Sequence, residues 1–217
     1  MFDVCVFILS VISVVLFVYF LLEFHYFFRA FLCMVNARFF KGNVFVLDET
    51  FVNGICLTND VDNLLNHMNN ARYLRELDFA RIDFYERTKL YERTVAKGGS
   101  VFIGASTIRY RRFIKIFSKY CISTKIVYWD NQNVYLEHKF ITHKNFVNAI
   151  SLCKLRFVKV DVEELMQNLM ETLPKNVEGC VRQKPLKPLE LEKWIESNQI
   201  SSENLLKNVQ KTDFFVA

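Results

Sequence analysis

The sequence predicts an α+β protein in which a curved antiparallel sheet wraps around one long helix, with an apolar helix before this domain and a helical extension after it. Three patterns predict this arrangement: an unbroken apolar run over residues 4–22, a helical periodicity from Asn69, and four later runs rich in β-branched and aromatic residues. The resulting boundaries are 1–42 for the membrane anchor and juxtamembrane linker, 43–160 for the domain and 161–217 for the extension.

The apolar run at residues 4–22 predicts a membrane-spanning helix. As a helix it would be about 30 Å long, the thickness of the hydrocarbon core of a bilayer. A cleaved signal peptide fits less well, because the only charged side chain ahead of the run is Asp3 and no small-x-small cleavage site follows it. We therefore expect a retained anchor that contacts membrane lipid through residues 4–28.

The charges around this run predict its orientation. No basic residue precedes it, whereas Arg29, Arg38 and Lys41 follow it, so the positive-inside rule places the domain in the cytosol. The lack of an Asn-x-Ser/Thr sequon, and six cysteines without a Cys-x-x-Cys pair, agree with a reducing compartment. The alternative is a domain in the secretory pathway, or one secreted after signal-peptide cleavage.

The overall charge excludes a typical nucleic-acid-binding protein. The net charge of +5 is modest for 217 residues, and much of the basic excess flanks the apolar run. No basic tail or stripe is present that would follow a phosphate backbone, so we expect no nucleic-acid partner. The chain that remains after the anchor is long enough for one domain with a sizeable core.

The first half of the domain predicts a strand and a helix. Residues 43–60 predict one or two short strands after a juxtamembrane linker at 36–43. From Asn69 apolar residues recur at steps of three or four, which predicts a helix that ends between Lys89 and Thr94. The apolar face of this helix consists of Tyr73, Leu77, Ala80 and Phe84.

Four strands are predicted after this helix, and short polar links indicate that the later ones pair antiparallel. One helix covers a five-stranded sheet only if the sheet curves strongly around it, which is the hotdog architecture. The outer surface and one edge of such a sheet remain for a second copy, so we expect a homodimer or a higher homo-oligomer. The four runs are residues 100–112, 119–130, 133–142 and 146–160.

The extension predicts two helices. Residues 161–173 form a short amphipathic pattern that Pro174 ends, and a second helical stretch begins at about Leu189. We expect this tail to pack on the domain or on the membrane surface.

The polar cluster ahead of the central helix is the main catalytic candidate. Unpaired amides at a helix N-terminus, here about Asn69 and Asn70, stabilise the negative charge that develops in acyl transfer. An upstream carboxylate, Asp62, can attack a carbonyl or activate water, which His67 or Asn66 can orient. A catalytic Asp62 should face a groove that leads to these amides. The alternative for each residue is helix capping or another structural role.

Two stretches of the sequence resemble known families. NDVDNLLNHMNNARYL, residues 59–74, resembles the D-x-x-x-H-V-N-N-x-x-Y signature of hotdog thioesterases of the 4-hydroxybenzoyl-CoA and plant acyl-ACP types. HMNNARYLRELDFAR and the tail LEKWIESNQISSENLL look like the animal thioesterase-superfamily-member-six proteins, and this resemblance covers nearly the whole chain. It implies a membrane-anchored hotdog protein, for which we expect the endoplasmic reticulum.

The resemblance also implies roles for individual residues. Asp62 corresponds to the base or nucleophile, and His67, with Asn63 or Asn66 as the amide, corresponds to the residues that act beside it. Asp62 and His67 are five positions apart, whereas the signature usually has four. This extra residue makes Asp60 an alternative carboxylate.

Other hotdog enzymes use a carboxylate on the central helix, for which Glu76 and Asp78 are candidates. An ion pair with Arg72 or Arg75 at helical spacing is the interpretation we prefer for both.

A basic patch lies at the end of the first of the four strand-like runs. Its residues Arg109, Arg111 and Arg112 can bind the phosphates of coenzyme A. Alternatively, the patch is a solvated hairpin or contacts anionic lipid headgroups.

The sequence thus predicts a membrane-anchored acyl-CoA thioesterase-like protein that hydrolyses or binds fatty acyl thioesters in lipid metabolism. Coenzyme A would be part of the substrate, with no separate cofactor or metal. The alternative is a non-catalytic membrane adaptor of the same fold that binds acyl chains or protein partners, which the extra residue in the motif and the long tail favour.

Overall fold

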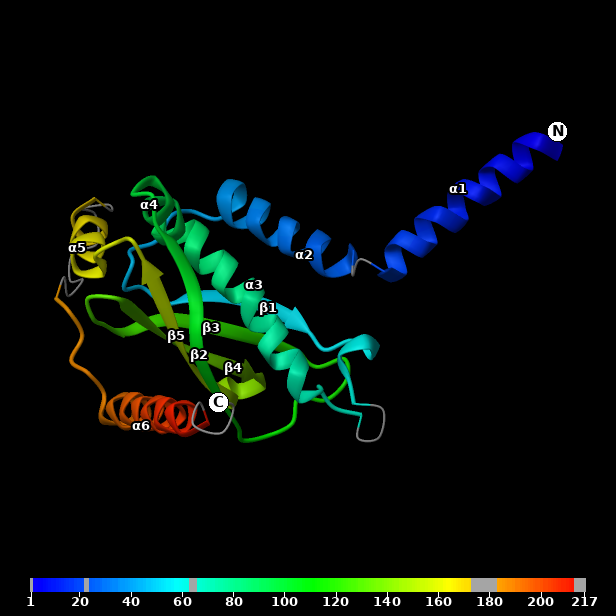
Figure 1. Cartoon of the computed structure of the whole chain (residues 1–217). Coiled ribbons are helices and arrows are strands. Elements are labelled where there is room, and N and C mark those ends of the chain that lie inside the picture. Colours follow the sequence, from blue (N-terminus) through cyan, green and yellow to red (C-terminus); the bar gives the residue numbers. More distant parts are fainter. Residues whose placement is uncertain (1, 22–23, 63–65, 173–182, 213–217) are drawn as a thin grey trace.

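The structure, a computed structural model, describes residues 2–21, 24–62, 66–172 and 183–212, and in it one curved sheet wraps around the helix α3 (Asn70–Thr88) (Figure 1). All neighbouring strands pair antiparallel. The predicted α+β hotdog fold is therefore confirmed. From edge to edge the strands are β1 (Thr50–Ile55), β3 (Lys119–Trp129), β4 (Asn133–Thr142), β5 (Phe146–Val158) and β2 (Ser100–Tyr110).

The core lies between α3 and the concave face of the sheet. Alternate residues of β4 such as Leu136 and Phe140 are fully buried, because successive side chains of a strand point to opposite faces. From the helix, Tyr73 and Leu77 pack in one apolar cluster and Phe84 in a second. The second cluster also receives the helix α5 (Val162–Thr172), which closes one end of the sheet.

The predicted central helix is divided in two. α3 ends at Thr88, Lys89 adopts a left-handed conformation with φ 60°, and a second helix, α4 (Leu90–Ala96), follows. A left-handed residue ends the regular helical path, which the apolar periodicity alone does not reveal. Gly98, with φ 72°, then turns the chain into β2.

One alternative for the basic patch was a solvated hairpin. The strands β2 and β3 on either side of the patch are not neighbours in the sheet, so their connection is not a hairpin. Instead the connection runs past the N-terminal end of α3. The Met68 amide donates to the Ile114 carbonyl at 2.8 Å, and the Ile116 amide donates to the Asn66 carbonyl at 3.3 Å. This segment therefore lies directly beside the candidate catalytic loop. The 3₁₀ turns η2 (Thr58–Asp60) and η3 (His143–Asn145) complete the loops at this end of the sheet.

The N-terminal region forms helices α1 (Phe2–Leu21) and α2 (Phe24–Val35), followed by a π-helical turn, η1 (Asn36–Phe40). Among the described residues, no helix combines the length and the apolarity that crossing a membrane requires. The membrane-spanning helix predicted from the sequence is therefore not confirmed. The helices α2 and η1 pack along α3 (Figure 1). The sequence had instead predicted membrane contact up to residue 28 and a linker at residues 36–43.

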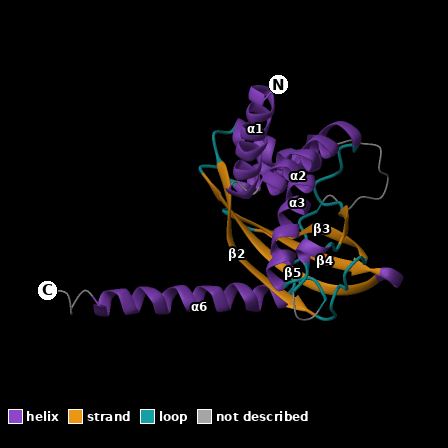
Figure 2. Ribbon diagram, turned by 90° about the vertical axis from the view of Figure 1, so that its right-hand side faces the viewer, coloured by secondary structure: helices purple, strands orange, loops and turns teal. Residues whose placement is uncertain are grey.

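The C-terminal extension contains both predicted helices. After α5, the helix α6 (Leu189–Thr212) crosses the convex face of the sheet (Figure 2). Its residues Leu191, Trp194 and Ile195 pack against Tyr135 and Leu152 of the central strands. The expectation that the tail packs on the domain is therefore confirmed for the first part of α6.

Candidate functional site

The polar cluster ahead of α3 forms a tight loop. The Asp60 carboxylate accepts a hydrogen bond from the Leu57 amide at 2.9 Å and so holds the η2 turn. The Asp62 amide donates to the His67 carbonyl at 2.8 Å. This backbone hydrogen bond brings together two residues that are five positions apart in the sequence. Asn63, the alternative amide, lies outside the described residues. The structure thus brings Asp62 and His67 together at their backbones.

Two asparagines begin the helix, and one of them caps it. The Asn69 side-chain oxygen accepts from the Ala71 amide at 2.9 Å, while the Asn69 amide itself donates to the Asp60 carbonyl at 2.8 Å. The Asn70 carbonyl accepts from the Tyr110 hydroxyl at 3.1 Å. The capping alternative is confirmed for Asn69, and the amides of Asn69 and Ala71 already have acceptors within the chain.

His67 is buried beneath an aromatic ring. Its imidazole stacks on Phe113 with 3.9 Å between the ring centroids and 5° between the planes. Nδ1 lies 3.0 Å from the Met68 carbonyl oxygen, which accepts a hydrogen bond when Nδ1 carries a hydrogen. Nε2 is buried and has no partner among the described residues. Asn66, by contrast, is exposed and left-handed, with φ 51°. The catalytic roles of Asp62, His67 and Asn66 stay predictions.

The three arginines of the basic patch lie on the surface near the end of β2. Arg109 is exposed within the strand. The guanidinium groups of Arg111 and Arg112 lie over the Phe146 ring, 5.3 and 4.2 Å from its centroid, and Arg111 also donates to the Val147 carbonyl at 3.3 Å. The aromatic contact orients two of these charges, and their contact with coenzyme A phosphates stays a prediction.

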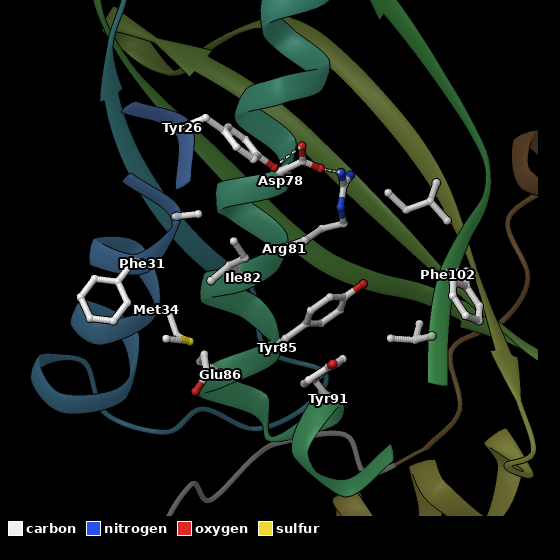
Figure 3. A pocket seen from close by; sticks show the side chains of 13 residues that line it. Tyr26, Phe31, Met34, Asp78, Arg81, Ile82, Tyr85, Glu86, Tyr91 and Phe102 are labelled. Atoms are coloured by element: carbon white, nitrogen blue, oxygen red, sulfur yellow. Dashed lines mark hydrogen bonds and ion pairs between the residues drawn. The ribbon is translucent and has the colours of Figure 1, made fainter. Parts of the chain in front are cut away.

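A pocket of about 630 Å³ lies between α2, α3 and β2, away from this loop (Figure 3). Its wall is mainly apolar and aromatic, and α2 supplies one side of it. None of the five residues predicted as catalytic lines it. Its principal side chains are Phe31 and Met34 from α2, Ile82 and Tyr85 from α3, Tyr91 from α4, and Phe102 from β2.

A carboxylate stands on the wall of this pocket. Asp78 accepts hydrogen bonds from the Tyr26 hydroxyl at 3.0 Å and from the Arg81 guanidinium (Figure 3). The side chain of Asp78 is 35% exposed, whereas that of Arg81 is 8% exposed. Burial raises the pKa of the Tyr85 hydroxyl beside them, so this phenol stays neutral near pH 7. The pocket therefore combines a mainly apolar wall with two carboxylates, the partly exposed Asp78 and Glu86, which pairs with Arg38.

The second helix carboxylate, Glu76, is buried and bound to α2. It accepts two hydrogen bonds from Arg29, at 2.5 and 2.6 Å, and one from the Tyr120 hydroxyl at 2.6 Å. The ion-pair interpretation was right for both carboxylates, but the partners Arg72 and Arg75 were wrong. Glu76 pairs instead with Arg29 of α2. Asp78 pairs with Arg81, three positions further along α3.

A row of polar side chains crosses the concave face of the sheet beneath α3. Thr50, Thr124, His138 and Ser151 are directly opposite one another on β1, β3, β4 and β5, and each is at most 1% exposed. Thr124 Oγ1 lies 2.9 Å from His138 Nδ1. Burial, reinforced by the nearby charge of Arg81, lowers the pKa of His138 to about 3. The imidazole is therefore neutral, and the row separates the two apolar clusters.

Sequence reasoning missed this row and the pocket. The row had a signal, because a polar residue stands at an inward-facing position in each of the four strands. The pocket had none, because Asp78 and Arg81 at a spacing of three have the pattern of an ordinary surface pair on a helix.

Comparison with known proteins connects this structure to a family. The family model of the thioesterase-like superfamily matches residues 56–196. Protein THEM6 of Drosophila melanogaster is 40% identical over 201 residues, which cover 92% of this chain and all of that relative. Protein THEM6 of Danio rerio is 37% identical over 161 residues, or 74% of this chain and 75% of the relative.

Solved structures of low sequence identity share the fold. The probable thioesterase YbaW from Escherichia coli superimposes with a TM-score of 0.50 at 20% identity and covers 57% of this chain and 96% of its own. A 1,4-dihydroxy-2-naphthoyl-CoA thioesterase from Synechocystis gives a TM-score of 0.50 at 9% identity, with 58% and 98% covered. The family model and the two relatives show that the chain belongs to the thioesterase-like superfamily and, within it, to the family of the THEM6 proteins.

Proposed function

We propose that this protein hydrolyses fatty acyl thioesters, with acyl-CoA as the substrate class. The observation that carries the proposal is the pocket between α2, α3 and β2, which has a mainly apolar wall and the partly exposed carboxylate of Asp78, held by two donors. An acyl chain fits such a wall because burying its methylene groups is favourable by about 0.8 kcal/mol each. The match to the thioesterase-like superfamily supports the same chemistry.

The chemistry requires one carboxylate near the thioester carbonyl. Acting as a general base, the carboxylate takes a proton from water, the hydroxide adds to the carbonyl carbon, and the carbon–sulfur bond breaks to release coenzyme A thiol and the fatty acid. Asp78 occupies the pocket, and Asp62 stands at the loop ahead of α3. Eight residues of helix, about 12 Å, separate Asn70 from Asp78 along the axis. We propose Asp78 as the first carboxylate to test and Asp62 as the second.

The coenzyme A end of the substrate would need cationic contacts. Arg109, Arg111 and Arg112 are the proposed phosphate ligands, because they are exposed and because the Phe146 ring orients two of them. Guanidinium groups bind phosphate through paired hydrogen bonds.

The competing function is acyl-chain binding without turnover. It is favoured by the helix cap, since the amides of Asn69 and Ala71 bond within the chain and are not open to an oxyanion. Asp78 also accepts hydrogen bonds from two donors already, which compete with a catalytic water for its oxygens. In this case the pocket would hold an acyl chain while the fold serves as an adaptor.

Release of coenzyme A from acyl-CoAs of increasing chain length, measured with the purified full chain, tests the proposal. We expect Asp78→Asn to lower the rate at least about tenfold, with Asp62→Asn measured in parallel and Glu92→Gln, on the exposed side of α4, unchanged. Wild-type release no faster than the uncatalysed reaction would refute hydrolysis, and equal release by the wild type, Asp78→Asn and Asp62→Asn would refute the roles of these two carboxylates. Tight binding of an acyl-CoA thioether in the same preparation, weakened by Ile82→Trp in the pocket, would then establish the adaptor function.

Membrane attachment through the N-terminal region belongs to the proposal as well. Its support is the apolar sequence of α1 and the exposure of side chains such as Phe7, Leu9 and Phe17. Placement in the endoplasmic reticulum with the domain in the cytosol stays a prediction, which a glycosylation experiment tests below.

A further inference from the structure

A polar hollow of about 490 Å³ lies between α6 and the strands β2 and β5, on the convex side of the sheet. It shares no lining residue with the pocket that contains Asp78. Leu191 and Ile195 fix α6 on the central strands, so the helix forms a stable wall of the hollow. The lining residues are Gly104 and Ala105 of β2, Lys154 and Arg156 of β5, and Ile195, Asn198, Gln199, Ser201 and Ser202 of α6.

Two cations stand on the strand side of this hollow. Lys154 and Arg156 are two positions apart on β5, so their side chains point to the same face of the sheet. Among the described residues, neither side chain has an ion-pair partner, and no carboxylate lines the hollow. Two positive charges held close together repel each other, and an anion between them removes that cost. The residues opposite them on the neighbouring strands are uncharged: Phe102, Ala105, Asn133 and Tyr135.

The helix side of the hollow adds hydrogen-bond donors. The Nδ2 atom of Asn198 is buried and has no acceptor among the described residues. The Ser202 hydroxyl donates to the Asn198 carbonyl at 2.9 Å, and Ser201 supplies a second hydroxyl. A hydroxyl can turn toward another acceptor, and a buried donor without an acceptor is costly. The hollow therefore combines two cations with neutral donors and suits an anion with several acceptor oxygens.

A glycine keeps the space above the two cations open. The pairing of β2 with β5 shifts register between Ile103 and Ala105, and Gly104 is the extra residue of this β-bulge. A Cβ atom at Gly104 would lie 3.7 Å from the Cβ of Arg156 and 3.9 Å from the Cδ of Lys154. A larger side chain at this position would therefore cover the stems of both cations. Glycine inside a strand often marks the close approach of a ligand.

We propose that this hollow binds the phosphate group of a phosphate monoester. Such a group carries a charge of about −1.5 to −2 at pH 7 and has three strong acceptor oxygens. Lys154 and Arg156 together balance a dianion, whereas a carboxylate has only one charge to offer. The guanidinium group can bind two phosphate oxygens through paired hydrogen bonds, and the ammonium group adds a point charge.

The polar lining favours a ligand whose remainder is also polar, in contrast to the mainly apolar pocket beside α2. The same phosphate group occurs on small soluble esters and on the headgroup of phosphatidic acid, and the experiment below separates these two sources. The inference does not depend on the hydrolysis of thioesters, because the hollow and the pocket lie on different sides of the sheet.

Calorimetric titration of the full-length chain in neutral detergent, at about pH 8, tests the proposal. The probes are glycerol phosphate and short-chain phosphatidic acid, and the one that binds more tightly identifies the source of the phosphate. We expect Lys154→Gln with Arg156→Gln to raise the dissociation constant of that probe at least about tenfold. Binding of neither probe to the unmodified chain overturns the proposal.

A matched control removes the same two kinds of charge from exposed positions outside the hollow. Arg93→Gln with Lys119→Gln should leave the dissociation constant unchanged, since neither residue lines the hollow. Equal weakening in both double variants would assign binding to the overall charge of the protein and overturn the site. Acetate, which has a single negative charge, should bind at least about tenfold more weakly than the phosphate probe, and equal binding refutes a phosphate site.

A second variant blocks the hollow without removing a charge. Gly104→Leu places a branched side chain above Lys154 and Arg156 and should weaken phosphate binding at least about tenfold. Gly104→Ala is its control, because a methyl group there makes only ordinary contacts of 3.7 Å or more, and it should keep most of the affinity. Undiminished binding to Gly104→Leu would place the phosphate elsewhere and overturn the proposal.

Discussion

Arg29 of α2 and the buried Glu76 of α3 form a two-pronged ion pair, with nitrogen–oxygen distances of 2.5 and 2.6 Å. They are 47 positions apart in the sequence, and Tyr120 donates a third hydrogen bond to the same carboxylate. A buried carboxylate is costly unless it is paired, so α2 is required by the domain and is more than a connection to α1. The boundary expected at residue 42 therefore separates residues that the fold joins.

Removal of this arginine should destabilise the domain strongly. Arg29→Ala leaves Glu76 buried with only Tyr120 as its partner, so the free energy of unfolding should fall by about 3 kcal/mol, at the lower end for a buried pair because Arg29 is itself 35% exposed. Urea unfolding measures this loss. Arg38→Ala removes the exposed pair of Arg38 with Glu86 and should have a much smaller effect. Equal losses would contradict the role of Glu76.

The buried His138 should make stability depend on pH. Its pKa in the folded state is about 3, below the ordinary value of 6.5, so the unfolded chain binds more protons between these values. The contribution of His138 is fully present above about pH 6.5 and is lost as the pH falls toward 3, at up to about 1.4 kcal/mol per pH unit. Thermal or urea unfolding from pH 7 to pH 4 measures the slope.

The variant His138→Gln should flatten that slope, although it lowers stability at pH 7, because glutamine does not titrate. His143→Gln, at an exposed position in η3, serves as the control and should keep the slope of the unmodified chain. An unchanged slope in His138→Gln would assign the acid sensitivity to other groups.

Asn69 offers a direct choice between capping and catalysis. Asn69→Ala removes the acceptor of the Ala71 amide and should cost about 1 kcal/mol of stability, whereas Asn69→Asp keeps a good cap. If capping is its whole role, release of coenzyme A by Asn69→Asp should equal that of the unmodified chain. Asn70→Ala, whose side chain is exposed, should change stability little. Loss of activity in a stable Asn69→Asp would instead support the role predicted from the sequence.

Membrane topology can be tested with one added sequon. Leu206→Thr completes an Asn-x-Thr sequence at the exposed Asn204, and expression in cells should leave this site unglycosylated if the domain is cytosolic. The positive control carries a cleavable secretory signal in place of residues 1–22 and should gain a glycan. A glycan on Asn204 in the variant that keeps residues 1–22 would place the domain in the lumen.

The sequence predicted the fold closely because its strongest signals are local. Each of the four later strands begins at the expected residue, and α6 begins at Leu189 as expected. The second helix, α4, was missed because the single left-handed residue Lys89 leaves the apolar periodicity intact. The site was harder to predict. Asn69 fits both a cap and an oxyanion site, and the sequence does not reveal that its amide bonds to Asp60.

The sequence by itself determined the element order, the antiparallel sheet around one helix and the family, since periodicity and motif spacing are properties of neighbouring residues. Only the tertiary structure decided that Arg29 neutralises Glu76, that Asp78 stands in an apolar pocket and that His138 lies in a buried polar row. These relationships join α2, α3 and separate strands of the sheet. The partner of a buried charge is set by packing among such distant segments, and spacing along the chain does not encode it.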